Sequence, residues 1–197
     1  MKTIVTFAML MSMAILSANA QSTDTGSGGS TSGSSIGIDL RPVFGGANGT
    51  NLQYQRSMGS FNLRLAAGLS GTSNDLAGVE TNTYNHFLRG GIGFQSGSDK
   101  VSFNYGGDLV FGKEGTKILN GGTTTKESTT TIALRPFIGV AYQVTPRFSL
   151  STEAYGSFGN YTTKQSFENA GVTTETTTDG ISYQFVNGLR FYARYHF

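Results

Sequence analysis

Arginine and carboxylate side chains are the residues of this sequence whose types and spacing could do chemistry. They recur at alternate positions of short segments, six arginines with three acids: Asp39, Arg41, Arg64, Arg89, Asp108, Arg135, Glu153, Arg190 and Arg194. The planar, permanently charged guanidinium suits crowded pairing with carboxylates better than the lysine ammonium does. We therefore expect these nine side chains to form one internal charge network. An unpaired buried guanidinium is costly, so we expect Glu114 and tyrosine hydroxyls to offset part of the excess positive charge.

Side chains suited to catalysis or metal binding are scarce. The chain has two histidines, His86 and His196, and no cysteine. Neither histidine lies beside a carboxylate in the sequence. Zinc-ligand spacing, a phosphate-binding loop and a serine elbow motif do not occur. We predict no catalytic residue, no metal and no cofactor, and therefore no enzyme.

Further carboxylates fall in polar connecting segments: Asp75, Glu80, Glu127, Glu168, Glu175 and Asp179. Two of them could act as an acid–base pair at the rim of a pocket. Solvated loop charges are the simpler interpretation, because connecting segments are polar by default. The net charge of +2 is too small to indicate nucleic-acid binding.

The elements that position these residues begin after an export signal. Lys2, an apolar stretch from Ile4 to Leu16 and the Ala18-Asn19-Ala20 site predict a cleaved signal peptide over 1–20. Residues 21–34 read as a Gly/Ser-rich linker, and 35–197 as a single domain.

Beyond the linker, apolar and polar residues alternate with period two, which is typical of β-strands. Eight strands are predicted, at 36–44, 51–58, 61–69, 84–94, 101–111, 132–144, 148–158 and 181–197. The connections alternate in length, with tight turns at 58–60, 95–100 and 145–147 and long polar segments at 70–83, 114–129 and 159–180. Outer-membrane barrels have short periplasmic turns and longer external loops. An even number of strands then leaves both chain ends in the periplasm.

The residue types decide which row of side chains faces lipid. The polar row carries arginine and acids, whereas lysine beyond the signal peptide occurs only in turns, loops and outer strand ends. Glycine also concentrates on the polar row, where a missing side chain makes room inside a narrow lumen. The apolar row is rich in Phe, Leu, Ile and Tyr, as expected for a lipid-facing surface. We predict that the apolar row faces outward.

These features resemble the small outer-membrane β-barrel proteins of the OmpA/OmpX type over residues 36–197. Phe191, Ala193, Tyr195 and Phe197 resemble the C-terminal signal by which the barrel-assembly machinery recognises its clients. The resemblance implies an all-β fold, a transmembrane antiparallel eight-stranded up-and-down β-barrel in the bacterial outer membrane. It also implies outer-membrane lipid and the assembly machinery as partners.

An Arg-Pro echo breaks the regular pattern. Leu40-Arg41-Pro42 is repeated as Leu134-Arg135-Pro136. Proline removes one hydrogen bond from a closed sheet, so we expect a bulge or local slack at Pro42 and Pro136.

Threonine-rich tracts predict that the external connections are partly strands. We interpret 116–131 and 160–180 as hairpins that rise past the membrane, since threonine favours strands and tolerates water. The leading hypothesis is a non-catalytic surface protein, structural or adhesive, with these hairpins as an edge for a host or surface protein. The first alternative is a narrow, porin-like pore, although an eight-stranded lumen is just wide enough for side chains to fill. The second is a lipid-active or proteolytic barrel enzyme.

Overall fold

The computed structural model describes residues 33–41, 50–97 and 100–197. The predicted signal peptide, residues 21–32 of the linker and Pro42 lie outside the described residues. The first strand begins at Ser34, one residue before the predicted start of the barrel domain.

Eight antiparallel strands form one closed ring in chain order. They are β1 (Ser34–Asp39), β2 (Thr50–Met58), β3 (Phe61–Leu76), β4 (Val79–Gly97), β5 (Val101–Asn120), β6 (Thr123–Thr145), β7 (Phe148–Asn169) and β8 (Val172–His196). The ring closes where β1 pairs with β8, from Ser35 opposite His196 to Asp39 opposite Tyr192. The predicted number of strands, their order and the up-and-down topology are confirmed.

The three long connections are strands rather than loops almost to their tips. β3 and β4 meet at Ala77–Gly78, β5 and β6 at Gly121–Gly122, and β7 and β8 at Ala170–Gly171. All six of these turn residues have positive φ, which is the conformation of a two-residue hairpin turn that continues the strand twist. The hairpins expected at 116–131 and 160–180 are confirmed. The polar loop expected at 70–83 is also a hairpin, because its Thr, Ser and Asn side chains suit a strand that is wet on both faces.

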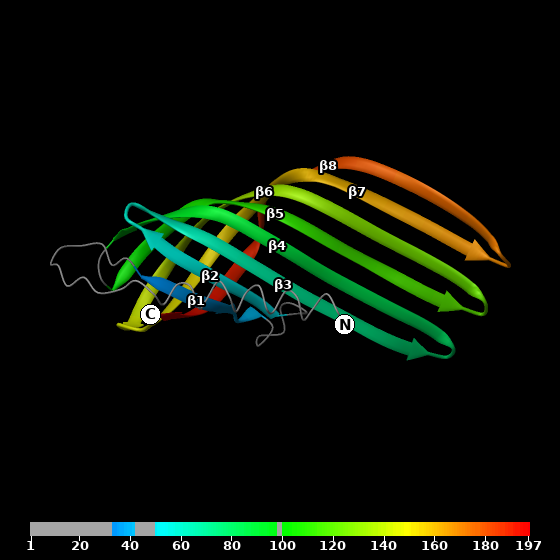
Figure 1. Cartoon of the computed structure of the whole chain (residues 1–197), viewed down its shortest axis with the longest axis horizontal. Coiled ribbons are helices and arrows are strands. Elements are labelled where there is room, and N and C mark those ends of the chain that lie inside the picture. Colours follow the sequence, from blue (N-terminus) through cyan, green and yellow to red (C-terminus); the bar gives the residue numbers. More distant parts are fainter. Residues whose placement is uncertain (1–32, 42–49, 98–99) are drawn as a thin grey trace.

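The barrel is lopsided, because its first two strands are short. β1 and β2 have 6 and 9 residues, whereas β7 and β8 have 22 and 25. β3 to β8 therefore continue past the ring as a curved sheet, with the hairpin tips at one end and the short turns and the C-terminus at the other (Figure 1). We call this sheet the extension.

The extension has two edges. Among the described residues, β8 pairs with β1 only from Tyr192 onward, so its segment 172–190 has β7 as its sole strand partner. Likewise, β3 beyond Leu69 has β4 as its only strand partner in the part of the chain that the structure describes. β6 is paired on both sides throughout 123–131, so this tract is interior to the extension and not an edge.

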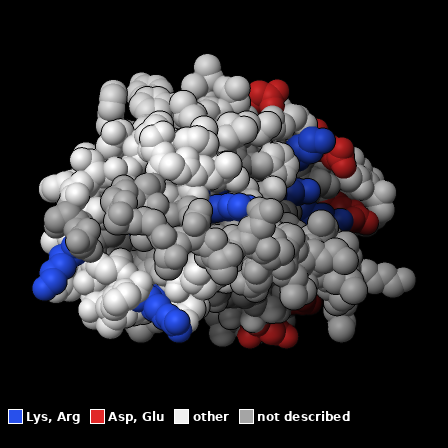
Figure 2. All heavy atoms as spheres, turned by 60° about the vertical axis from the view of Figure 1, so that its left-hand side comes forward, with Lys and Arg blue, Asp and Glu red and all other residues white. Residues whose placement is uncertain are grey.

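The barrel has polar side chains inside and apolar side chains outside, which is the reverse of a water-soluble protein. The interior buries charged and polar side chains, with Asp108 and Glu153 at 0% exposure. The outer surface exposes large apolar side chains such as Leu109 at 60% and Ile138 at 64%. Charged side chains are accordingly sparse over large areas of the surface in Figure 2. The prediction that the apolar row faces outward is confirmed.

Pro136 interrupts the sheet without shifting its register. β6 and β7 pair at Leu134–Phe158 and at Phe137–Tyr155, and no pair forms between these two. The expected local slack is therefore confirmed at Pro136. The register shift lies one strand further on, where Tyr155 faces Gly188 and Ser157 faces Gln184. Gly156 then stands opposite three residues of β8, 185–187.

Candidate functional site

The nine residues of the predicted charge network lie on the inward rows of the strands. They come from β1, from Arg41 two residues after its end, and from each strand from β3 to β8. Seven of the nine are buried, namely Asp39, Arg64, Arg89, Asp108, Glu153, Arg190 and Arg194. Arg41 and Arg135, nearer the outer mouth, are partly buried.

Glu153 of β7 is the most heavily engaged carboxylate. Its Oε2 lies 2.7 Å from Nη2 of Arg64, and its Oε1 lies 2.8 Å from Nη2 of Arg194. Each oxygen thus accepts a charge-assisted hydrogen bond from a different strand, which ties β3 and β8 to β7 across the lumen. Arg194 also donates to Oε1 of Gln53 on β2.

Asp108 of β5 extends this chain of charges. Its Oδ1 lies 3.6 Å from Nε of Arg64, and its Oδ2 lies 3.3 Å from Nε of Arg89. Nη2 of Arg89 in turn donates to the hydroxyl of Tyr192 at 2.9 Å. The series Arg194–Glu153–Arg64–Asp108–Arg89 therefore crosses the lumen, and the side chains that the sequence placed on one row meet in space.

Asp39 is not part of this series, which corrects the expectation that it meets the barrel arginines. Its Oδ2 lies 2.6 Å from Nη2 of Arg41 and 3.1 Å from Nδ2 of Asn51. Arg41 follows two residues later and also donates its backbone N–H to Asp39 Oδ1. A partner so close along the chain satisfies the carboxylate before a guanidinium from a distant strand can reach it.

Arg135 and Arg190 form no ion pair within the described part of the chain. Arg135 stands in register with Asp108, and Arg190 with Glu153, but those carboxylates are held by Arg64, Arg89 and Arg194. The two guanidiniums instead lie over the ring of Tyr155, at 5.5 and 3.8 Å from its centroid. Cation–π contacts of this kind replace part of the missing pairing.

The sequence analysis did not name the aromatic residues that contact the lumen arginines. Tyr155 holds Arg135 and Arg190, Tyr192 holds Arg89, and Phe137 lies 3.7 Å from the guanidinium of Arg64. All three aromatic residues share the inward row with the charges, and that shared parity was the available signal.

Glycine makes room for the charges, as its concentration on the polar row predicted. A Cβ at Gly91 would overlap Oδ1 of Asp108. A Cβ at Gly139 would come within 2.9 Å of Cγ of Glu153.

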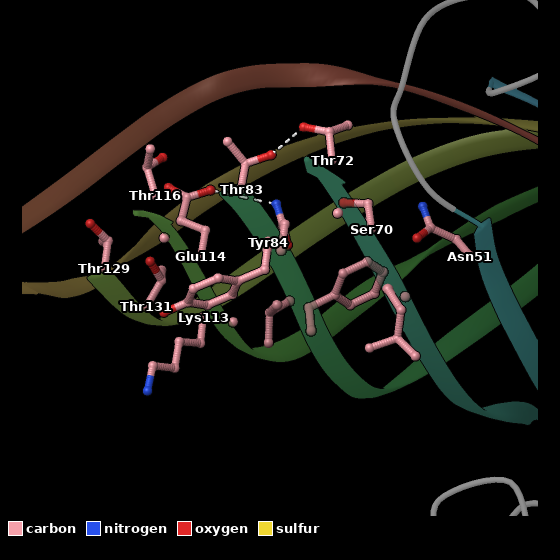
Figure 3. Close-up of a pocket in the computed structure, with 18 of the residues that line it drawn as sticks. Asn51, Ser70, Thr72, Thr83, Tyr84, Lys113, Glu114, Thr116, Thr129 and Thr131 are labelled. Carbon is pink, nitrogen blue, oxygen red and sulfur yellow. Dashed lines mark hydrogen bonds between the residues drawn. The ribbon is translucent and has the colours of Figure 1, made fainter. Parts of the chain in front are cut away.

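A cavity of about 630 Å³ opens above the network, at the outer mouth of the barrel. Arg135, Val110 and Phe87 are among the residues that line it, together with threonines of β3 to β6. Figure 3 shows Thr72, Thr83, Glu114 and Thr129 on the cavity side of the strands. Asn85 donates to Glu114 at 3.5 Å, so this carboxylate faces the cavity and does not pair with the lumen arginines.

Neither histidine forms a hydrogen bond or ion pair with a carboxylate within the described residues. His86 stacks on Tyr84 on the outer surface, with centroids 5.7 Å apart. Nε2 of His196 lies 2.8 Å from Oγ of Ser149 at the opposite end of the barrel. Asp75 and Glu80 stand in register at the tip of the first external hairpin, where both are exposed. The remaining acids named from the sequence, Glu127, Glu168, Glu175 and Asp179, lie on β6, β7 and β8 beyond the membrane band.

The four residues of the expected assembly signal alternate along the end of β8. Phe191, Tyr195 and Phe197 are exposed on the outer surface, and Ala193 is partly buried in the same row.

Comparison with solved structures places this fold among bacterial outer-membrane β-barrels. A major outer membrane protein from Thermus thermophilus superposes with a TM-score of 0.56 at 14% identity, covering 84% of this chain and 98% of that one. Ail, the attachment invasion locus protein of Yersinia pestis, gives a TM-score of 0.47 at 15% identity, with 84% and 94% covered. CarO of Acinetobacter baumannii gives 0.36 at 6% identity, with 84% and 97% covered.

The fold is therefore that of a small eight-stranded outer-membrane β-barrel protein. No family model matches the sequence, and no curated protein matches it significantly. In the residues described, no group of three or more His, Cys, Asp or Glu side chains could hold a metal ion. No helix in the described ranges is long and apolar enough to cross a membrane.

Proposed function

We propose that this protein is an outer-membrane surface protein that binds another protein along the β8 edge of its extension, with the barrel as a sealed anchor. The observation that carries the proposal is the segment 172–190 of β8, which has one strand partner among the described residues. An unpaired strand edge presents a row of backbone donors and acceptors that an extended segment of another chain can complete.

The composition of the outer part of this edge suits binding in water. Residues 173–178 are Thr, Thr, Glu, Thr, Thr and Thr, which favour the strand conformation without burying an apolar surface. Below them, Ile181, Tyr183 and Phe185 are 70% or more exposed, at the level where the apolar band of the barrel ends. The other Thr-rich tract, 123–131, supports the extension from within and is not part of the proposed binding edge.

The structure does not favour the pore alternative. The charge series from Arg194 to Arg89 crosses the lumen, and Phe137 and Tyr155 fill the space beside it. For the enzyme alternative, no histidine–carboxylate contact occurs within the part of the chain that the structure describes.

Adhesion of cells that display the protein tests the proposal. Proline substitutions at Thr176 and Thr177 form a matched pair, because successive backbone N–H groups of a strand point to opposite sides. One of the two removes a donor from the free edge, and the other removes a donor to β7. We expect the edge-facing substitution to abolish adhesion to host cells or matrix proteins while the barrel still folds, and Thr176→Ala to have little effect.

Two results would contradict the proposal. The first is an absence of adhesion by the full-length protein, which would leave the extension as an inert rim. The second is adhesion that survives removal of residues 163–178, which would move the binding surface elsewhere.

A further inference from the structure

Lysine is concentrated on one outer face of the extension. Beyond the signal peptide the sequence has five lysines, and four of them lie on the adjacent strands β5, β6 and β7: Lys113, Lys117, Lys126 and Lys164. The fifth, Lys100, lies in the short turn at the opposite end. The lumen has arginine as its only basic residue type among the buried residues described, so the two kinds of cation occupy different places.

The strand register places all four lysines on the outward row. Lys113 follows the lipid-facing Phe111 by two residues and is exposed. Lys117 and Lys126 stand directly opposite each other, and Lys164 stands opposite Ser128. Figure 3 shows the Lys113 side chain on the opposite side of β5 from the Glu114 side chain.

Within the described ranges, these lysines have no carboxylate partner. None of the four forms an ion pair among the described residues. Like charges directly opposite each other in an antiparallel pair are destabilising, and Lys117 and Lys126 form such a pair. A polyanion on this face would remove that repulsion.

The lysines rise in steps above the apolar band. The band on β5 runs from Val101 to Phe111, which spans about 25 Å at ~3.4 Å per residue and a strand tilt of ~40°. By the same arithmetic along β5, Lys113 stands about 5 Å above the band and Lys117 about 15 Å. The headgroup layer of a phospholipid leaflet is only about 5–8 Å deep. On β5, Lys113 lies within this depth and Lys117 stands above it.

We propose that the outer face of β5–β7 binds a phosphate-bearing glycolipid of the outer leaflet, a lipopolysaccharide, through Lys113, Lys117, Lys126 and Lys164. The flexible ammonium groups contact phosphates at successive heights along the sugar headgroup. The acyl chains lie below against Phe111, Ile132 and Leu134. The inference rests on the outer-membrane placement of the protein and is independent of strand addition at β8.

The neighbouring strands restrict the lipid to one side of the barrel. At the level of Lys113, β4 carries His86 and β8 carries Asp179 on the outward row. At the level of Lys117 and Lys126, the corresponding residues are Asn82 and Glu175. The β8 side is therefore acidic and repels phosphate, so the lipid site and the proposed protein-binding edge occupy different faces.

The test uses the full-length protein refolded in phosphatidylcholine vesicles to which one further lipid is added. The lipids are lipopolysaccharide, the same lipopolysaccharide after dephosphorylation, and phosphatidylglycerol. The test variant carries Lys113→Gln, Lys117→Gln, Lys126→Gln and Lys164→Gln. The control variant carries Arg56→Gln, Lys100→Gln and Arg147→Gln, which remove positive charge at the opposite end. The temperature at which the folded band is lost on unheated gels reports stability, and a titration of lipid gives an apparent affinity.

Lipopolysaccharide should stabilise the wild type and the control variant, and the quadruple variant should bind it at least tenfold more weakly. One cation beside an anionic membrane surface changes the binding affinity by about fivefold. Loss of four lysines should therefore weaken binding by at least the stated amount. Dephosphorylated lipopolysaccharide and phosphatidylglycerol should each stabilise the wild type much less.

Equal affinity of the quadruple variant and the wild type would overturn the proposal, as would equal stabilisation by dephosphorylated lipopolysaccharide. Equal stabilisation by phosphatidylglycerol would also overturn it, because it would show that the lysines do not need a tall sugar headgroup. Adhesion of cells that display the quadruple variant distinguishes the two proposals. The lipid site can be wrong while adhesion at β8 is observed, and adhesion can be absent while the lysines still bind the lipid.

Discussion

At the scale of single residues, the interior of this barrel is organised around two carboxylates that each hold two guanidiniums. Glu153 and Asp108 neutralise Arg64, Arg89 and Arg194, while Arg135 and Arg190 depend on the ring of Tyr155. Each strand beyond β2 contributes at least one of these charged residues. The network therefore links strands that are not neighbours in the ring.

Removing Glu153 should be the most damaging single change in this network. Glu153→Ala leaves Arg64 and Arg194 without their carboxylate in a buried site, which should cost about 3–5 kcal/mol of unfolding free energy. Glu168→Ala, at the exposed tip of the last hairpin, should cost less than about 0.5 kcal/mol. Urea titrations of both variants in lipid vesicles measure the difference, and equal midpoints would contradict the network.

The outward row makes a second prediction at this scale. Leu134→Arg places a charge in the apolar band and should lower the unfolding free energy by about 2–4 kcal/mol. Thr124→Arg lies on the same row of the same strand, above the band, and should be nearly neutral. Refolding yields and urea titrations in vesicles compare the two. Normal folding of Leu134→Arg would place this row away from lipid.

At the scale of elements, the turns of the external hairpins are tight although two of the three do not have typical turn sequences. Two of the three have alanine at the first turn position, Ala77 with φ 52° and Ala170 with φ 49°. The left-handed conformation costs an L-residue about 1 kcal/mol, and asparagine followed by glycine is the preferred pair. The sheet on both sides of the turn enforces this conformation.

Asparagine at these positions should therefore stabilise the hairpin tips locally. We expect Ala170→Asn to slow amide exchange of the residues beside the turn by about fivefold, which corresponds to about 1 kcal/mol. Gly171→Ala, at φ 80°, should speed exchange at the same amides. Hydrogen exchange of the refolded protein measures both, and faster exchange in Ala170→Asn would contradict the assigned turn geometry.

At the scale of the whole molecule, charged side chains cross the lumen at the membrane level and a cavity opens above them. The charge series crosses the lumen, and the cavity of about 630 Å³ begins at its outer side. The extension then continues the sheet outward on one side only (Figure 1). This shape combines a rigid anchor with two exposed surfaces, the β8 edge and the β5–β7 face.

This arrangement predicts how well the protein conducts ions. The wild type in planar bilayers should show no steady channel, because the interior of a small eight-stranded barrel is filled by side chains. Replacing Arg64, Glu153 and Arg194 together by alanine removes the crossing without leaving an unpaired partner among the three. This triple variant should conduct ions more than the wild type does. Steady single-channel currents from the wild type would favour the pore alternative.

The sequence by itself determined the strands, their number and the direction in which each row faces. Period two is a local property, and the contrast between arginine with glycine on one row and Phe, Leu and Ile on the other is visible without coordinates. The inward placement of the charged residues followed from the same parity, and the two later hairpins followed from the threonine tracts.

Only the tertiary structure decided which partners meet and which edges stay free. Ion pairs between β3, β5, β7 and β8 depend on ring closure and stagger, which no single strand encodes, so the separation of Asp39 and the stacking on Tyr155 could not be predicted. The same reason applies to the two threonine tracts. They are alike in composition, but 123–131 is enclosed by β5 and β7, whereas 173–180 lies at an edge because β1 is only 6 residues long. The four lysines likewise form one face only once the register aligns three strands.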